Sequence, residues 1–154
     1  MNAILDSNLI SFREMTEQDL ALVLEIEQSV YEFPWSVNIF KDCMRVGYYC
    51  QVMEDEQCVV GYSALSIAAG ESHLLNICVH KAKQGKGLGH KLLAHSIETA
   101  KRLNASIIFL EVRETNQVAI QIYHSTGFNQ IGTRQNYYPA KKGKEDALIF
   151  ALQL

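Results

Sequence analysis

The sequence predicts a mixed α/β fold, in which one central mixed sheet of about seven strands carries helices on both faces. Strand-like runs and amphipathic helical stretches follow one another in the order β-α-α-β-β-β-α-β-α-β-β. The apolar run at residues 106–113 is typical of a strand buried on both faces of a sheet. A strand at residues 71–80 leads through a glycine-rich turn into an amphipathic helix. The length predicts one domain, residues 1–154, with a full core.

The chain is predicted to open with a strand at residues 9–14 and two helices. Thr16–Asp19 resembles a capping box with Asp in place of the usual Glu, so a helix should begin just after it. Apolar residues then recur at helical spacing, at Leu20, Val23, Leu24 and Ile26. Phe33-Pro34-Trp35-Ser36 interrupts the pattern, and Ser36 can cap a second helix that ends near Arg45.

The middle of the chain is predicted to form three strands and a long helix. Strands at residues 48–53 and 58–68 are joined by the acidic turn at 54–56, and the strand at 71–80 follows. The helix is expected over residues 87–103, because one of its faces is apolar, with Leu88, Leu92, Leu93, Ile97 and Ala100.

A short helix and an antiparallel pair of strands are predicted to end the chain. Thr115 or Asn116 can cap the helix at residues 116–125, and Gly127 ends it as a C′ glycine does. The pair comprises residues 128–138 and 145–154.

Composition excludes several classes of protein. The net charge of −3 gives no basic field for nucleic acid, and no apolar run reaches the roughly 18 residues that cross a bilayer. Residues 1–9 lack a basic start and contain Asp6, so we expect no secretory signal and a cytoplasmic protein.

Cysteine and histidine spacing predicts reduced thiols and no metal. No C-x-x-C pair occurs, and each cysteine is expected to be a small buried hydrophobe: Cys43, Cys50, Cys58 and Cys78. His90 and His95 are five residues apart rather than the four that a zinc-binding helix uses.

The glycine-rich turn is the most informative motif. Its backbone N–H groups at a helix N-terminus can bind a phosphorylated ligand. No Gly-Lys-Ser or Gly-Lys-Thr occurs, which excludes a P-loop, and the last glycine has the wrong spacing for a dinucleotide fingerprint. An ordinary strand–turn–helix connection is the alternative. The pattern Q-x-x-G-x-G, on Gln84, Gly87 and Gly89, resembles the coenzyme A pyrophosphate loop of the GNAT superfamily of N-acetyltransferases.

Further motifs make the resemblance specific. Asn116-x-x-Ala119-x-x-x-Tyr123-x-x-x-Gly127-Phe128 matches the superfamily pattern at every fixed position. Phe33-Pro34-Trp35-Ser36 and Arg134-x-x-Tyr137-Tyr138-Pro139 are similar to the ribosomal-protein-alanine N-acetyltransferases, the RimI group. The similarity covers residues 12–152, although residues 80–83 lack a common proline and Thr115 replaces a common Ser.

The resemblance implies a fold, a reaction and a set of site residues. The sheet would be mostly antiparallel and splayed between its fourth and fifth strands. Acetyl-CoA would acetylate the N-terminal alanine of a small-subunit ribosomal protein by direct attack, with Glu111 as general base, directly or through water, and Tyr123 as general acid. Cofactor-binding residues would be Ile77, Cys78, Val79, Gln84, Gly85, Lys86, Gly87, Leu88, Gly89, His90 and Asn116. We expect no metal, no contact with nucleic acid or membrane, and a monomer.

Alternatives exist for the site residues and for the function. Glu111 could instead pair with Arg113 or a lysine, Tyr123 could be a core aromatic, and Asn116 could only cap its helix. Cys78 lacks an evident base to activate it as a nucleophile. A peptide could meet aromatic and acidic side chains, namely Phe33, Trp35, Tyr137, Tyr138, Glu32, Glu145 and Asp146. The chain could also acetylate small amines or internal lysines, or bind acyl-CoA without catalysis.

Overall fold

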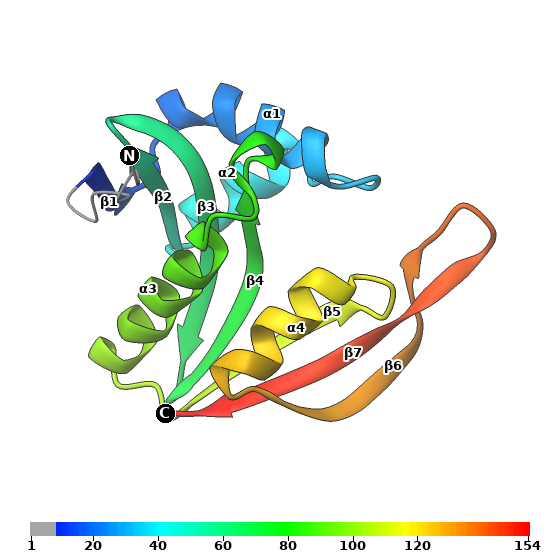
Figure 1. Ribbon diagram of the computed structural model, residues 1–154. Helices are drawn as coiled ribbons and strands as arrows, with labels where there is room; N and C mark the ends of the chain where they lie inside the picture. Colours follow the sequence, from blue (N-terminus) through cyan, green and yellow to red (C-terminus); the bar gives the residue numbers. More distant parts are fainter. Residues whose placement is uncertain (1–8) are drawn as a thin grey trace, which may run out of the picture. The chain divides into compact units, whose positions relative to one another are not determined.

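The computed structural model describes residues 9–154, and every predicted strand and helix is present in the predicted order (Figure 1). The strands are β1 (Ile10–Glu14), β2 (Tyr49–Asp55), β3 (Cys58–Ala68), β4 (Glu71–Val79), β5 (Ile107–Arg113), β6 (Asn129–Pro139) and β7 (Lys144–Gln153). The α-helices are α1 (Leu20–Val30), α2 (Val37–Arg45), α3 (Leu88–Arg102) and α4 (Gln117–Thr126). Two short 3-10 helices, η2 (Glu17–Asp19) and η3 (Lys81–Lys83), precede α1 and α3.

The seven strands form one sheet in the order β1-β2-β3-β4-β5-β7-β6. The pair β4–β5 is parallel, whereas β5–β7 and β6–β7 are antiparallel. The ladder between β4 and β5 starts at Glu71–Ile107 and ends at Leu74–Leu110, so the later residues of the two strands are not paired with each other in it. A mostly antiparallel sheet whose fourth and fifth strands part early was predicted, and the ladder confirms it.

The chain divides into two compact units. The N-terminal unit comprises the residues up to Ala64 together with Asn76–Leu92, and the C-terminal unit comprises Leu65–Leu75 and Leu93–Leu154. Both β3 and β4, as well as α3, continue from one unit into the other.

The N-terminal unit has two apolar clusters, on opposite faces of its strands. The first packs α1 and α2 through Val23, Ile26 and Phe40 against Val52 and Tyr62. The second packs the first turn of α3 through Leu88 and Leu92 against Met53, Val60 and Val79. Because neighbouring strand residues point to opposite faces, Val52 and Met53 belong to different clusters. Helices on both faces were predicted, and this unit confirms them.

Strand alternation is interrupted at Gly61. Val60 and Tyr62 are two residues apart and should share a face, yet they belong to different clusters. A Cβ atom at residue 61 would lie 2.8 Å from the Cys78 carbonyl oxygen. Only glycine therefore allows β3 to approach β4 this closely.

The C-terminal unit corrects one prediction. Residue burial alternates along β5, with Ile108, Leu110 and Val112 buried and the residues between them half-buried. The strand is therefore fully covered on one face only, and Glu111 lies on the half-buried face. The apolar run did not reveal this, because half-buried positions such as Phe109 are also apolar.

Local signals were accurate at most of the predicted caps. The Ser36 hydroxyl accepts from the Ile39 N–H, the Asp19 carboxylate accepts from the Thr16 N–H (2.8 Å), and Gly127 ends α4 with φ +106°. The β2–β3 turn lies at Glu56 and Gln57, which both have positive φ, rather than at residues 54–56. A tight hairpin that follows the strand twist requires such dihedral angles at both of its central residues.

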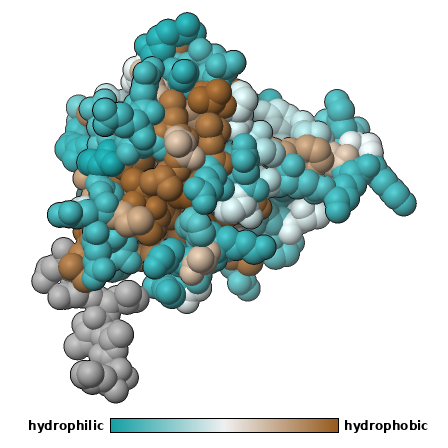
Figure 2. Space-filling model, turned by 90° about the horizontal axis from the view of Figure 1, so that it is seen from above, coloured by the Kyte–Doolittle hydropathy of each residue, from teal (hydrophilic) through white to brown (hydrophobic). Residues whose placement is uncertain are grey.

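Three further findings concern exposure and the membrane. All four cysteines are free thiols, but Cys58 is exposed, which corrects its predicted burial. Figure 2 shows apolar residues gathered on the face seen from above, and exposed hydrophobic side chains include Leu22 and Ile39.

Over residues 9–154, no helix is long and apolar enough to cross a membrane. The prediction of no secretory signal concerns mainly residues 1–8, which lie outside the described residues.

Candidate active site

The glycine loop presents backbone donors at the start of α3. Gly85 and Gly87 have φ of +79° and +80°, in the left-handed region that favours glycine. A Cβ atom at either position would meet nothing within 4 Å, so the loop is open there. Lys91 N–H donates to the Gly87 carbonyl (3.2 Å), and the three preceding N–H groups have no acceptor within the helix. Three unpaired donors at the positive end of a helix suit a phosphate group.

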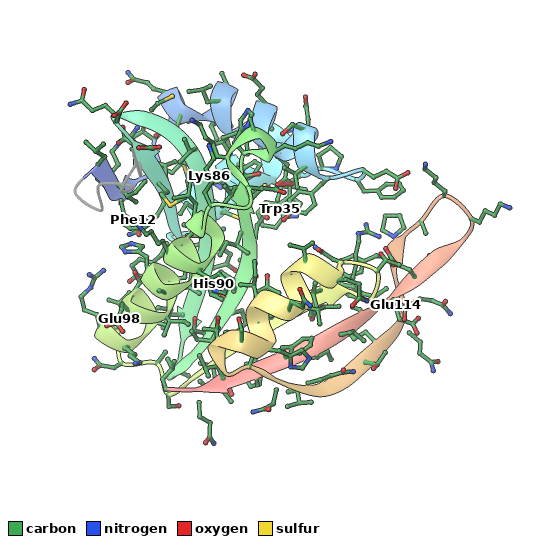
Figure 3. The ribbon with its side chains drawn as sticks, viewed as in Figure 1. Phe12, Trp35, Lys86, His90, Glu98 and Glu114 are labelled. Atoms are coloured by element: carbon green, nitrogen blue, oxygen red, sulfur yellow. The ribbon has the colours of Figure 1, made fainter. Side chains whose placement is uncertain are left out.

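Side chains brace this loop against the end of β4. Gln84 Nε2 donates to the Val79 carbonyl (3.0 Å), which anchors the loop entrance. His80 N–H donates to the Val60 carbonyl (2.8 Å), and His80 Nδ1 accepts from the Ala82 N–H (3.0 Å). Lys86 lies in the loop and His90 in the first turn of the helix (Figure 3).

Cys78 is not placed to act as a nucleophile. The side chain is buried, and this burial raises the pKa of its thiol to about 12. His80, the base nearest in sequence, already accepts a backbone hydrogen bond through Nδ1. A thiol that keeps its proton at neutral pH is unreactive, which agrees with direct transfer rather than an acetyl-enzyme.

A buried carboxylate that the sequence analysis missed holds the end of β4 in place. Glu27 is 1% exposed, and its Oε1 accepts from the Tyr62 hydroxyl (2.7 Å) and from Asn76 Nδ2 (2.8 Å). Its Oε2 accepts from the Trp35 N–H (2.9 Å). The spacing offered a clue, since Glu27 lies four residues after Val23 on the buried stripe of α1.

The segment between α1 and α2 belongs to this same arrangement. Trp35 packs edge-on against Phe40, with ring centroids 5.2 Å apart, in the first apolar cluster. The Tyr31 hydroxyl donates to the Ile77 carbonyl (2.8 Å). The segment around Phe33–Ser36 is therefore linked to β4 directly by Tyr31 and through Glu27 by the Trp35 N–H. The ring of Trp35 has a packing role.

In the C-terminal unit, Glu111 stands at the end of β5 and pairs with Arg134 of β6. Arg134 Nε lies 3.0 Å from Glu111 Oε1, and the two side chains are 56% and 27% exposed. The Arg134 guanidinium carbon also lies 5.5 Å from the centre of the Tyr137 ring, and the neighbouring Glu111 carboxylate raises the pKa of Tyr137. Arg113, the partner considered from the sequence, is not the cation that Glu111 uses.

Arg113 instead pins the β6–β7 hairpin. Its Nη1 donates to the Pro139 carbonyl and to Glu145 Oε1, each at 2.7 Å, and the pairing lowers the pKa of Glu145. The Thr115 hydroxyl donates to the other oxygen of Glu145 (2.9 Å). The guanidinium carbon lies 4.5 Å from the centre of the Tyr138 ring. Glu145 is therefore occupied within the protein rather than free for a basic peptide.

Tyr123 combines a core ring with an available hydroxyl. The ring packs against Phe128 and Phe150 at centroid distances of 5.7 and 6.2 Å, and burial raises the pKa of the phenol above its usual value. Within residues 9–154 its hydroxyl makes no hydrogen bond to another residue, and Tyr123 as a whole is 7% exposed.

Two of the remaining predictions concern Asn116 and metals. Asn116 caps α4, since its Oδ1 accepts from the Ala119 N–H (3.3 Å), and its side-chain NH₂ group takes no part in the cap. Among the described residues no three His, Cys, Asp or Glu side chains are grouped to hold a metal ion.

Comparison with known proteins decides the family. The model of the acetyltransferase (GNAT) family matches residues 12–128. The chain belongs to this family. It is 36% identical, over 147 residues, to the ribosomal protein bS18-alanine N-acetyltransferase of Escherichia coli, covering 96% of this chain and 98% of that protein. The GNAT loop pattern and the RimI-like motifs seen in the sequence are thereby confirmed as a family resemblance.

Solved structures agree. The crystal structure of the ribosomal-protein-S18-alanine N-acetyltransferase from Escherichia coli superposes with a TM-score of 0.87 at 33% identity, covering 94% of this chain and 93% of that one. The acetyltransferase yncA from Salmonella typhimurium, solved with its cofactor acetyl-CoA, has a TM-score of 0.78 at 24% identity, covering 96% and 95%. This second likeness shows the fold alone.

Proposed function

We propose that this protein transfers the acetyl group of acetyl-CoA to the α-amino group of an N-terminal alanine on a small-subunit ribosomal protein. Family membership supports acetyl transfer, and the Escherichia coli relative, named for this reaction on bS18, supports the substrate. One observation carries the proposal. The C-terminal unit holds a partly exposed carboxylate, Glu111, beside Arg134, and a phenol, Tyr123, whose ring is packed in the core; the two groups would serve as base and acid in one proton-transfer reaction.

The residues of the glycine loop fit the co-substrate. The N–H groups of Leu88, Gly89 and His90 would hold the pyrophosphate, with Gly85, Lys86 and Gly87 shaping the loop and Gln84 anchoring it. Ile77, Cys78 and Val79 would offer strand-like backbone hydrogen bonds to the pantetheine arm. The Asn116 NH₂ group, which the helix cap leaves unused, would contact the same molecule. When bound, acetyl-CoA supplies an activated acetyl group as a thioester.

Glu111 acts as the general base in this proposal, directly or through a water. An α-amino group has a pKa of about 7.7–8.0, so removing its proton costs little near neutral pH, whereas a lysine amine near 10.4 costs more. Arg134 lies 3.0 Å from one oxygen of Glu111 and holds the carboxylate in place at its end of the sheet.

Tyr123 acts as the general acid. A phenol holds its proton at neutral pH, and the Tyr123 hydroxyl would give this proton to the departing sulfur. Burial raises the pKa of the phenol, which favours its return to the protonated form after transfer. The packing of its ring against Phe128 and Phe150 fixes the direction of the hydroxyl. The core role considered for Tyr123 thus supports its catalytic role rather than competing with it.

The proposal extends to the whole chain. Residues 1–154 act as a single catalytic domain, supported by a family model whose match includes parts of both units. The enzyme works as a monomer in the cytoplasm, and its four free thiols are what a reducing compartment maintains.

Mass spectrometry of a designed peptide tests the function. The peptide has an N-terminal alanine, several arginines and one internal lysine, and it is incubated with the protein and acetyl-CoA. Acetylation of the alanine nitrogen alone is expected, and a peptide with a blocked N-terminus is the matched control. Acetylation of the lysine would favour the lysine or small-amine alternative. Binding of acetyl-CoA without release of free thiol, for any amine offered, would favour a non-catalytic subunit.

A further inference from the structure

The β6–β7 hairpin carries an irregularity beside Glu111. Arg134 pairs with Ala147, whereas Tyr138 pairs with Glu145. Residues 135–137 therefore lie opposite a single residue of β7, Asp146. Such a bulge bends its strand and turns the neighbouring side chains away from the directions of a regular ladder.

Asp146 contacts this bulge through its side chain and the end of β5 through its backbone. Its side-chain Oδ1 accepts from the Asn136 N–H (2.9 Å), the middle residue of the bulge. Its carbonyl accepts from the Glu114 N–H (3.3 Å), just beyond β5. Asn136 has φ +52°, a left-handed conformation that asparagine adopts more readily than most residues other than glycine. The hydrogen bond to the Asp146 carboxylate holds the Asn136 N–H in this conformation.

The bulge places two consecutive tyrosines against two residues of β5. Consecutive residues of a regular strand point to opposite faces. Here Tyr137 lies beside Arg134, whose guanidinium carbon is 5.5 Å from the centre of the Tyr137 ring and whose Nε is 3.0 Å from Glu111. Tyr138 instead stacks on Arg113 at 4.5 Å. The two tyrosine rings lie edge to face, with centroids 4.9 Å apart. Arg134, at the start of the bulge, completes the set of groups around Glu111.

We propose that Asp146 is a positioning residue for acetyl transfer: by holding the Asn136 bulge it keeps the Tyr137 hydroxyl beside the carboxylate of Glu111. The proposal rests on the function proposed above, because it takes Glu111 as the base. Asp146 does not contact the reacting groups in this role, and its effect passes through Tyr137.

The titration of Tyr137 in the free protein gives a test that needs no activity. Its hydroxyl faces Glu111, which raises the pKa of Tyr137, and Arg134, which lowers it. NMR of ¹³C-labelled tyrosine follows each phenol with pH, and Tyr137→Phe assigns the signal. In Asp146→Ala, the pKa of Tyr137 should fall toward its value in Glu111→Gln. In Asp146→Asn, whose amide oxygen can still accept from Asn136, it should stay near wild type.

Kinetics supplies the second readout. Asp146→Ala should lower kcat/KM for the alanine peptide roughly 10- to 100-fold, as a small misplacement near a reacting group does. Adding Tyr137→Phe should lower it little further, because both changes remove the same contact with Glu111. Asn136→Gly, which keeps the N–H and relieves the strained φ, is the matched control and should match wild type. Asp146→Ser, whose hydroxyl is too short to replace the carboxylate, gives the same test if Asp146→Ala does not fold.

The outcomes separate this proposal from the function on which it rests. An unchanged Tyr137 titration in Asp146→Ala would overturn the positioning role, even in an active enzyme. Effects of Asp146→Ala and Tyr137→Phe that multiply would also overturn it. The pKa of Tyr137 could fall in Asp146→Ala while the wild-type protein acetylates no N-terminal alanine. This result would agree with the role of Asp146 in holding the bulge and would contradict only the proposed function.

Discussion

Two carboxylates, one in each unit, show how similar groups acquire different roles. Glu27 is 1% exposed and is bound by three uncharged donors, from Tyr62, Asn76 and Trp35. The Glu111 side chain is 27% exposed and faces the cation of Arg134. A carboxylate whose oxygens are already used cannot take a proton from a substrate, whereas a half-exposed one can. Burial and partner type, rather than residue type, distinguish Glu27 from Glu111, the proposed base.

The largest expected effect on folding comes from Glu27. Glu27→Ala leaves the Tyr62 hydroxyl, the Asn76 amide and the Trp35 N–H without their acceptor, and each buried unpaired group costs about 1–3 kcal/mol. We expect the free energy of unfolding to fall by about 4 kcal/mol in chemical denaturation. Glu25→Ala, at an exposed position of the same helix, is the control. Equal stability of the two variants would show that the hydrogen bonds of Glu27 do not stabilise the fold.

Two tyrosines sharpen the comparison. Tyr123→Phe keeps the packed ring and removes only the hydroxyl, so transfer should slow by about 100-fold while stability changes by less than about 0.5 kcal/mol. Tyr62→Phe removes a buried hydroxyl that donates to Glu27, so it should lower stability by about 1–2 kcal/mol. Single-turnover rates and denaturation curves of both variants test whether Tyr123→Phe affects mainly the rate and Tyr62→Phe mainly the stability. Full activity of Tyr123→Phe would show that Tyr123 is not the general acid and has only a packing role.

The glycine loop should show an effect on binding rather than on chemistry. Gly87→Ala forces a side chain into φ +80°, which costs about 1–2 kcal/mol. Acetyl-CoA affinity measured by calorimetry should fall about 5- to 30-fold, with kcat at saturation little changed. Gly132→Ala, at a strand position without positive φ, is the control. Unchanged affinity in Gly87→Ala would place the phosphate elsewhere.

The smallest expected effect concerns an ion pair at the edge of the N-terminal unit. Arg13 lies 2.7 Å from Asp19 and lowers the pKa of that carboxyl to about 2, below its ordinary value near 3.9. The stabilisation is therefore present above about pH 4 and is lost as the pH falls toward 2. Asp19→Asn should cost about 1 kcal/mol at pH 7 and flatten this acid dependence of stability. If Asp19→Asn lost stability in acid as the wild type does, other carboxyl groups would be the cause of the acid dependence.

Local sequence patterns predicted elements well and partners poorly. The helical spacing of Leu88, Leu92 and Ile97 placed α3 to within one residue at each end, and the C′ glycine at residue 127 ended α4 as expected. These signals arise within a few turns of one helix. By contrast, the donors to Glu27 lie at residues 35, 62 and 76, and no local pattern relates them.

The C-terminal unit gives the same lesson for the candidate site. The motif around Asn116 and Tyr123 predicted a helix directly after the strand that ends at Arg113, and α4 lies there. The cation beside Glu111 did not follow from sequence distance, because Arg113 is taken by Glu145 and the β6 bulge brings Arg134 and Tyr137 instead. A bulge without glycine leaves little trace in composition, so its position came from pairing and not from the sequence.

The most direct test of this account is the single-turnover rate of Glu111→Gln on the N-terminal alanine peptide, measured across pH with acetyl-CoA affinity and unfolding followed in parallel. Loss of a general base should slow transfer by about 100- to 10,000-fold. The variant should bind acetyl-CoA and unfold like wild type, since Glu111 belongs to neither the loop nor a core cluster. A wild-type rate at neutral pH would show that Glu111 is not the base. The proposed difference in role between Glu111 and Glu27 would then be wrong.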